Sequence, residues 1–393
     1  MIPWKRNLGV VWISQFFAMA GMSSVVPFLP LYIRELGVTR PEQTAFWSGL
    51  VFAAPFMVSF FVAPVWGSLG DKYGRKLMTI RAVFGLAAAQ LLVGFAGDVY
   101  QLFFFRMLQG ALSGFYPAAI ALVASNTPRE RNGYAIGMVQ SAATAGNIVG
   151  PLVGGSLADA FGFRNVFFIV GGLILLTGVL VAWLVEEINK PKKERAETLV
   201  QNWKTVLSTR QLRMAALFTL AGAFSVSLAR PVFVLYVETF DVAKSSLAIV
   251  TGALYSVTGV FTALSSAWLG RSVDKRGVRN AIVLAAGGTG AMYVLHSVVY
   301  DLYLLAPLRA AIGFAYGVLP VAIYAWIGKS VEDERKGAIF GVTSSFQILG
   351  IMLGSVASGS IASAAGFRFP FALAGVTLIG VAVVAFFRVF KNE

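Results

Sequence analysis

The stretch "GSLGDKYGRK", residues 67–76, places one acid and three bases between two apolar segments of the chain. The segment before it, residues 43–70, exceeds the roughly 18 to 20 residues that a helix needs to cross a membrane. The segment after it, residues 82–97, is shorter and equally free of charge until its end. Glycines permit a tight turn, and bases favour the cytoplasmic side of a membrane. The stretch therefore predicts a short cytoplasmic turn between two membrane-spanning helices.

The composition of the whole chain extends this prediction to an integral membrane protein. Of 393 residues, 57% are hydrophobic and 13% are charged, against about 25% charged in an average soluble domain. Eight apolar runs exceed the length of a membrane span: 7–33, 43–70, 132–158, 165–185, 245–270, 280–300, 337–367 and 369–387. Four further runs are short or contain one arginine: 82–97, 102–125, 214–237 and 303–328. We therefore predict an all-α integral membrane protein with twelve transmembrane helices.

The net charge of +14 is distributed in a way that indicates membrane topology and not nucleic-acid binding. If both termini lie in the cytoplasm, the cytoplasmic segments hold 24 lysines and arginines, and the outer loops hold five. Because basic residues favour the cytoplasmic side, this split predicts the orientation. We expect a multi-pass protein of the cytoplasmic (inner) cell membrane with both termini in the cytoplasm.

An internal repeat divides the chain into two similar halves. At an offset of 203 residues, Gly67, Asp71, Gly74, Arg106, Gly110, Gly114 and Pro117 fall on Gly270, Asp274, Gly277, Arg309, Gly313, Gly317 and Pro320. We predict two parallel six-helix bundles, residues 1–188 and 212–393, joined by a cytoplasmic linker at 189–211. Parallel halves of this kind are typical of transporters with a substrate site between the halves.

The loop between the second and third predicted helices carries the most specific motif. Its pattern Gly67-x-Leu69-x-Asp71-x-x-Gly74-Arg75-Lys76 resembles, at every marked position, the loop signature of the major facilitator superfamily, and within it of the twelve-helix drug/proton antiporters. The resemblance implies that this loop, with Asp71 near Lys336, latches the two halves on the cytoplasmic side. The repeated loop keeps Asp274 but lacks the Arg-Lys pair, so we expect a weaker second latch. An ordinary anchored turn is the alternative.

Two arginines, Arg106 and Arg309, lie inside predicted helices at equivalent positions of the repeat. A charge inside a membrane span costs at least ~2.5 kcal/mol on insertion scales and usually faces a cavity or a partner. The resemblance connects Arg106, which is followed by Gly110, with proton transfer, and we extend this expectation to Arg309. Snorkelling of Arg106 to the outer surface of the membrane is the alternative.

The predicted fifth helix contains "GNIVGPLVGG", residues 146–155, which resembles the antiporter signature of the same family. The matching residues are Gly146, Gly150, Pro151, Gly154 and Gly155. Glycines at these spacings let helices approach closely, and Pro151 removes a backbone hydrogen bond and can kink the helix. The second half has Ser355 in place of the proline. Because the signature resembles that of exporters, this asymmetry favours efflux by exchange over uptake.

The first and seventh predicted helices share a proline and a tyrosine in "VVPFLPLY" and "ARPVFVLY", residues 25–32 and 229–236. The first stretch resembles the proline motif of drug exporters. We expect helix kinks at the prolines and a central cavity lined by Pro27, Tyr32, Arg230 and Tyr236. Arg230 has no counterpart in the first half, and a lone intramembrane arginine suggests a substrate or coupling role. Pairing of Arg230 with a backbone carbonyl or a headgroup is the alternative.

The predicted membrane interior lacks several kinds of reactive residue. None of the 18 acids falls at mid-membrane, although several drug/proton antiporters of the resembling family use a buried carboxylate as proton carrier. His296, the single histidine, lies near the outer end of the ninth helix, where we favour an interfacial role over a proton relay. The chain has no cysteine and no cluster of catalytic or metal-binding residues at membrane depth. We therefore expect no enzyme activity, no metal and no cofactor.

These patterns together predict a secondary active transporter that works by alternating access. The resemblance implies proton-driven export of lipophilic drugs or antibiotics, and the small number of polar residues inside the helices agrees with an apolar cavity. Energy would come from an ion gradient, because the chain has no nucleotide-binding motif. A sugar or metabolite carrier of the same fold is the alternative. We expect small lipophilic substrates, protons and membrane lipids as partners, no nucleic acid, and a monomer.

Overall fold

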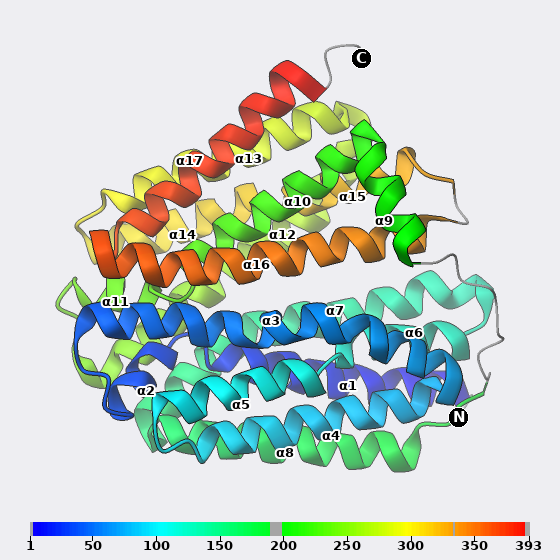
Figure 1. Ribbon diagram of the computed structural model, residues 1–393, viewed down its shortest axis with the longest axis horizontal. Coiled ribbons are helices and arrows are strands. Elements are labelled where there is room, and N and C mark those ends of the chain that lie inside the picture. The colour runs from blue at the N-terminus through cyan, green and yellow to red at the C-terminus, as the bar shows by residue number, and fades with distance from the viewer. Residues whose placement is uncertain (1–2, 189–198, 333–334, 390–393) are drawn as a thin grey trace. The chain divides into compact units, whose positions relative to one another are not determined.

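The computed structural model describes residues 3–188, 199–332 and 335–389, and the regular structure of this part is entirely helical (Figure 1). The first half contains α1 (Pro3–Ser24), α2 (Leu29–Glu35), α3 (Pro41–Tyr73), α4 (Arg75–Gly94), α5 (Val99–Leu112), α6 (Phe115–Asn126), α7 (Asn132–Phe161) and α8 (Phe163–Leu184). The second half contains α10 (Arg210–Ala229), α11 (Phe233–Glu238), α12 (Leu247–Arg276), α13 (Val278–Ser297), α14 (Leu302–Tyr316), α15 (Val318–Lys329), α16 (Lys336–Ala365) and α17 (Phe369–Val384). A short helix, α9 (Leu199–Ser208), lies within the predicted linker.

Most of these helices have the length and composition of membrane spans. Within the described residues, ten spans are long and apolar enough to cross a membrane, and α1 with α2 forms an eleventh that is bent by 57°. The predicted all-α membrane fold is thereby confirmed, whereas the count of twelve stays a prediction. Although α7 has the length of a span, it is less apolar because glycine, serine and amide side chains replace large apolar ones.

The chain forms two compact units. Unit 1 consists of Met1–Thr39, Ala54–Glu194 and Ala243–Ser256, and unit 2 consists of Arg40–Ala53, Arg195–Val242 and Val257–Glu393. Each unit therefore contains most of one half of the repeat and a short segment of the other half. Two helices change units along their length, α3 after Ala53 and α12 after Ser256.

Unit 1 is built around α1, which packs against α7 and α8. Glycines of α7 allow the close approach, because a methyl group added to Gly146 would lie 2.6 Å from the carbonyl oxygen of Phe16. Gly150 and Gly154 face backbone carbonyls of α1 in the same way. Helix α4 covers the other side of α8. Small residues at these contacts let backbones approach where lipid supplies no hydrophobic driving force between helices.

Unit 2 repeats this arrangement with α10, which packs against α16. Gly350 and Gly354 of α16 face carbonyls of α10, and they are the repeat partners of Gly146 and Gly150. Helix α9 packs against α10 and α16. The rings of Trp203 and Phe346 join α9 to α16 with centroids 5.3 Å apart.

The prolines of the first and seventh spans coincide with breaks in the helices. Helix α1 ends before Pro27 and α2 begins after it, while α10 ends before Pro231 and α11 begins after it. Proline has no backbone N–H and cannot continue the hydrogen-bond ladder of a helix. The structure therefore has helix breaks at both predicted prolines, with a bend of 57° at the first, whereas α7 continues through Pro151.

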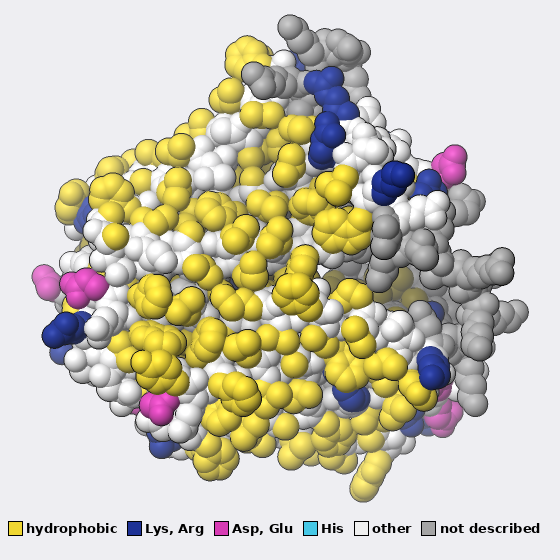
Figure 2. All heavy atoms as spheres, viewed as in Figure 1, with side chains coloured by type: hydrophobic (Ala, Val, Ile, Leu, Met, Phe, Trp, Pro, Cys, Tyr) yellow, Lys and Arg dark blue, Asp and Glu magenta, His cyan; other side chains and the backbone are white. Residues whose placement is uncertain are grey.

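Apolar side chains cover the outer surfaces of the helices, and charged side chains gather near helix ends (Figure 2). Trp183, Trp268 and Phe61 are among the most exposed, with 83%, 74% and 73% of their surfaces accessible. Large exposed apolar surfaces mark sites of contact with membrane or protein partners. Here they agree with a chain that is surrounded by lipid.

Candidate functional site

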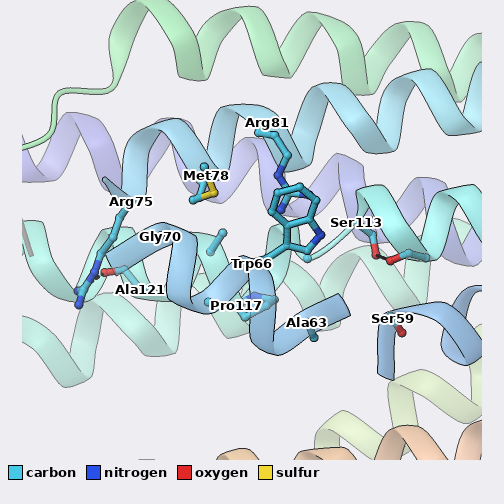
Figure 3. Close-up of a pocket in the computed structure, with 14 residues that line it drawn as sticks. Ser59, Ala63, Trp66, Gly70, Arg75, Met78, Arg81, Ser113, Pro117 and Ala121 are labelled. Carbon is cyan, nitrogen blue, oxygen red and sulfur yellow. Dashed lines mark hydrogen bonds between the residues drawn. The ribbon is translucent and has the colours of Figure 1, made fainter. Parts of the chain in front are cut away.

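A cavity of about 140 Å³ lies in unit 1 between α3, α4 and the junction of α5 with α6 (Figure 3). It brings two residues of the predicted latch together with residues of the predicted fourth span. Its lining includes Gly67, Gly70, Arg75, Arg81, Gly114 and Pro117. The wall is mostly apolar, and the charged side chains that line it are the two arginines.

The junction of α5 and α6 is a break in the fourth span at Ser113 and Gly114. Gly114 has a φ of +105°, a left-handed conformation that favours glycine. The indole Nε1–H of Trp66 donates a hydrogen bond of 2.7 Å to the carbonyl of Ala111, and a guanidinium N–H of Arg81 donates one of 3.0 Å to Leu112. These side chains satisfy carbonyls that the break releases from the helix.

Trp66 and Arg81 also contact each other at this break. The guanidinium carbon of Arg81 lies 3.5 Å from the centre of the Trp66 ring, which is a cation–π distance, and Figure 3 shows the two groups stacked. The sequence analysis missed both residues. The available signal was the pair Ser113-Gly114, which interrupts an otherwise continuous helical pattern with a residue suited to a break.

The predicted latch loop is a tight turn between α3 and α4. Gly74 has a φ of +106°, and the backbone N–H of Arg75 donates a 2.7 Å hydrogen bond to the carboxylate of Glu187. The Arg75 guanidinium donates to the carbonyl of Ala121 at 3.0 Å, while Lys76 is half-buried. A carboxylate at the start of a helix is stabilised by the free N–H groups there. Glu187 is thus a further member of this site that the sequence analysis did not identify.

The side chains of Asp71 and Asp274 lie outside the described part of the structure. Their backbones belong to α3 and α12. The predicted approach of Asp71 to Lys336 therefore stays a prediction. Gly67 lies within α3 with open space beside it and is not part of the turn. The glycine that forms the tight turn is Gly74.

Arg106 lies in the interior of unit 1 at the start of a short chain of polar side chains. It is 7% exposed, and its guanidinium donates a 2.6 Å hydrogen bond to the side-chain oxygen of Gln109. The amide of Gln109 donates in turn to Gln90 of α4 at 2.9 Å. A side chain that snorkels would point to the membrane surface, whereas this one points to buried amides. Gln109 and Gln90 are functional candidates that the sequence showed only as scattered polar residues.

Arg309 is also buried, at 2% exposed, but it lies among aromatic rings of unit 2. Its guanidinium carbon lies 3.8 Å from the centre of the Phe233 ring. His296 packs beside it, stacked on Phe371 with ring centroids 4.5 Å apart. His296 lies in the last turn of α13, near the helix end as predicted, and its side chain is fully buried; its interfacial role stays a prediction. Phe233 and Tyr236 of α11 and Phe371 of α17 lie against its ring, and these contacts could not be inferred from its place near a helix end.

The glycines of the antiporter signature divide between two neighbours of α7. Gly146, Gly150 and Gly154 face α1, whereas Gly155 faces the carbonyl of Ala248 in α12. The carbonyl of Pro151 lies against Gly252 of α12. The motif therefore serves close packing on two faces of one helix.

The four predicted cavity residues lie at or near the breaks of the first and seventh spans. Tyr32 and Tyr236 are fully buried, and their hydroxyls donate to the backbone carbonyls of Val93 at 3.1 Å and His296 at 2.8 Å. Pro27 lies within the break itself. Arg230 is exposed at the end of α10, close enough to Tyr293 and Tyr316 for its charge to act on both.

Comparisons with known proteins agree with this architecture. A sequence model of the Major Facilitator Superfamily matches residues 11–299 and 215–393. The multidrug resistance protein MdtG of Salmonella schwarzengrund is 35% identical over 382 residues, covering 96% of this chain and 94% of that protein. The protein of the same name from Citrobacter koseri is 36% identical over 385 residues, covering 96% and 93%.

A solved structure has the same fold at low sequence identity. The crystal structure of a bacterial homologue of the human lysosomal transporter Spinster aligns with a TM-score of 0.81 and 16% identity, covering 98% of this chain and 97% of that chain. At this identity the likeness concerns the fold alone.

Proposed function

The chain belongs to the Major Facilitator Superfamily, and from that membership we propose that it exports lipophilic drugs or similar small molecules in exchange for protons. The observation that carries the proposal is the similarity to multidrug resistance proteins over nearly the whole chain. As a member of this transporter family, the chain is a carrier and not an enzyme.

In this proposal, export proceeds by alternating access of two six-helix halves, residues 1–188 and 212–393, with both termini in the cytoplasm. The repeat and the split of basic residues between the two sides support this arrangement. The cytoplasmic latch would consist of Gly67, Asp71, Gly74, Arg75 and Lys76, with Asp274 as its weaker counterpart. The bond between Glu187 and the first N–H of α4 supports a fixed geometry for this loop.

Coupling to protons would involve Arg106. A guanidinium keeps its proton under physiological conditions, so Arg106 acts as a fixed positive charge and not as the carrier of the proton. Gln109 and Gln90 hold the guanidinium in place inside unit 1. The proton itself would travel on the substrate or on a carboxyl group at the outer ends of the helices.

The substrate would bind near the breaks at Pro27 and Pro231, with Arg230 as its charged contact. Arg230 is exposed and lies next to the tyrosines of α13 and α14. Tyr32 and Tyr236 would not contact the substrate directly. Their buried hydroxyls would instead hold the broken helices in place through hydrogen bonds to neighbouring backbones. A positive group without a buried acid at mid-membrane favours neutral or anionic lipophilic substrates.

A drug-susceptibility panel tests the proposal with cells that contain or lack the protein. We expect the protein to lower susceptibility to neutral and anionic lipophilic compounds, and we expect a protonophore to abolish the effect. The Arg230→Gln variant should lose the protection against anionic compounds and keep that against neutral ones. Unchanged susceptibility to every class, at verified expression, would contradict export of lipophilic drugs.

A further inference from the structure

The outer end of α7 holds the first turn of α12 by a carboxylate. The Oδ2 atom of Asp159 accepts a 2.9 Å hydrogen bond from the backbone N–H of Ile249, and the backbone N–H of Ala248 also donates to this carboxylate. Both donors belong to the first turn of α12, whose N–H groups have no partner within the helix. Asp159 is exposed, so a proton from water can reach it.

Below this carboxylate, α7 and α12 touch backbone to backbone. Gly155 faces Ala248, Gly252 faces Pro151, and the hydroxyl of Ser256 donates a 2.6 Å hydrogen bond to Ile148. Residues 247–256 of α12 carry no charge. Asp159 is therefore the charged group at the end of an otherwise neutral contact, which lies entirely within unit 1.

The same segment of α12 contains a buried polar group without a partner among the described residues. Thr251 is fully buried, and its hydroxyl has no hydrogen-bond partner there. An unsatisfied buried hydroxyl costs free energy that is recovered when water reaches it. Access of water to this segment of α12 would therefore lower the free energy of Thr251, while Asp159 holds the first turn of the helix in place.

Few other charges act on Asp159. Within the described residues it has no ion pair, and its bonds go to backbone groups of α12. Of the nearby basic residues, Arg164 at the start of α8 donates to the carbonyl of Ala96, and Lys244 lies in the 3-10 turn η2 (Lys244–Ser246) before α12. Two other acids at helix ends, Asp98 and Asp301, cap the helices that they themselves begin.

We propose that Asp159 is a proton-operated clamp that holds α12 against α7 on the side predicted to be extracytoplasmic. As a carboxylate it accepts the N–H bonds and complements the positive end of α12. When a proton from the outer solution binds a carboxylate oxygen, the negative charge is lost, the N–H bonds weaken, and α12 can separate from α7. On reclosing, the proton returns to the same solution. Asp159 is therefore a gating residue for the proposed export and not the carrier of the exchanged proton.

The absence of cysteine from the chain makes a direct test possible. A single cysteine at Thr251, whose side chain makes no hydrogen bond to the described residues, reports opening through its reaction with a membrane-impermeant maleimide applied outside. A cysteine at Leu254, 6% exposed, serves as a second reporter. A cysteine at Tyr300, 80% exposed, corrects for the effect of pH on thiol reactivity.

We expect acidification of the outer solution to raise the corrected labelling rate at position 251. Asp159→Asn should raise that rate at neutral pH by roughly two- to fivefold, the range that a charge at a helix terminus supplies, and should remove its dependence on outer pH. Asp98→Asn and Asp301→Asn are matched controls and should leave the rate unchanged.

Equal labelling of the parent and the Asp159→Asn protein at both reporters would overturn the clamp, as would the same increase in the Asp301→Asn control. The measurement needs no substrate. A protein with a working clamp that confers no drug resistance would contradict the proposed function and leave the clamp standing.

Discussion

Arg106 and Arg309 occupy the same position in the two halves of the repeat, yet their side chains have different surroundings. Arg106 donates to Gln109, which donates to Gln90. At the equivalent positions, the second half has Ile312 and Tyr293. Arg309 accordingly lies over the ring of Phe233. Both halves thus have a buried arginine at this position, and in the first half it begins a chain of hydrogen-bonded amides.

The break in the fourth span shows a similar difference. The first half turns at Gly114 with a φ of +105°, and Trp66 and Arg81 donate to the carbonyls that precede it. In the second half α14 and α15 also meet at a glycine, but Gly317 keeps a right-handed conformation with a φ of −58°.

The residues that donate to the carbonyls at the first break are replaced in the second half. Leu269 and Leu284 replace Trp66 and Arg81. The hydroxyl of Ser265 donates a 2.5 Å hydrogen bond to the carbonyl of Phe314 in α14, and that of Ser266 donates one of 2.9 Å to the carbonyl of Gly317. At this level the described residues of the first half thus form a supported break, whereas Ser265 and Ser266 of the second half join neighbouring helices.

Removing the two arginines in turn gives the largest expected difference between the halves. Arg106→Ala should lower proton-driven efflux by roughly ten- to a hundredfold, because it removes a charged hydrogen bond worth about 1.5–3 kcal/mol from a buried chain. Arg309→Ala should keep most of the coupling and lower stability instead. Efflux is measured in vesicles with an imposed pH gradient, with expression verified for each variant. Unchanged proton coupling in the Arg106→Ala variant would show that Arg106 has only a structural role.

Substitutions at the two glycines should separate backbone strain from crowding. A methyl group added to Gly114 would meet the Arg81 guanidinium only at an ordinary contact distance of 3.8 Å, so Gly114→Ala costs about 1–2 kcal/mol through its left-handed conformation, and Gly114→Asn costs less. Gly317 faces the carbonyl of Thr262, so Gly317→Ala costs about 1–3 kcal/mol through crowding, and the larger Gly317→Asn costs more. The midpoint of thermal unfolding in detergent shows which substitution, Ala or Asn, destabilises more at each glycine. The same order at both glycines would contradict the difference in backbone geometry.

Much of the fold could be predicted from the sequence because its causes are local. The length of the apolar runs predicts the spans, and Pro27 and Pro231 predict the breaks, whereas the orientation inferred from charge stays a prediction. The roles of Gly146 and Gly350 in helix packing also follow from small residues at repeated spacings.

The candidate site could be predicted only in part, because its contacts join residues far apart in the chain. Trp66 and Arg81 meet carbonyls of α5 that lie 45 and 31 residues away in the chain, and Glu187 lies 112 residues from Arg75. No local pattern encodes such pairs. The burial of His296 could not be predicted for the same reason, since the rings that bury it come from other helices.

The two loop aspartates provide the smallest expected difference between the halves. Asp71 is followed by Gly74, Arg75 and Lys76, whereas the loop of Asp274 lacks the Arg-Lys pair. Asp71→Asn should lower transport roughly two- to fivefold with expression intact, the range expected for a charge lost from a helix N-terminus, and Asp274→Asn should lower it less. Initial rates of substrate export, normalised to protein in the membrane, give both values. Normal transport by Asp71→Asn would contradict the proposed latch. Equal losses in the two variants would show that the Arg-Lys pair does not strengthen the first loop. A loss confined to Asp71→Asn would show that the first loop is the functional one.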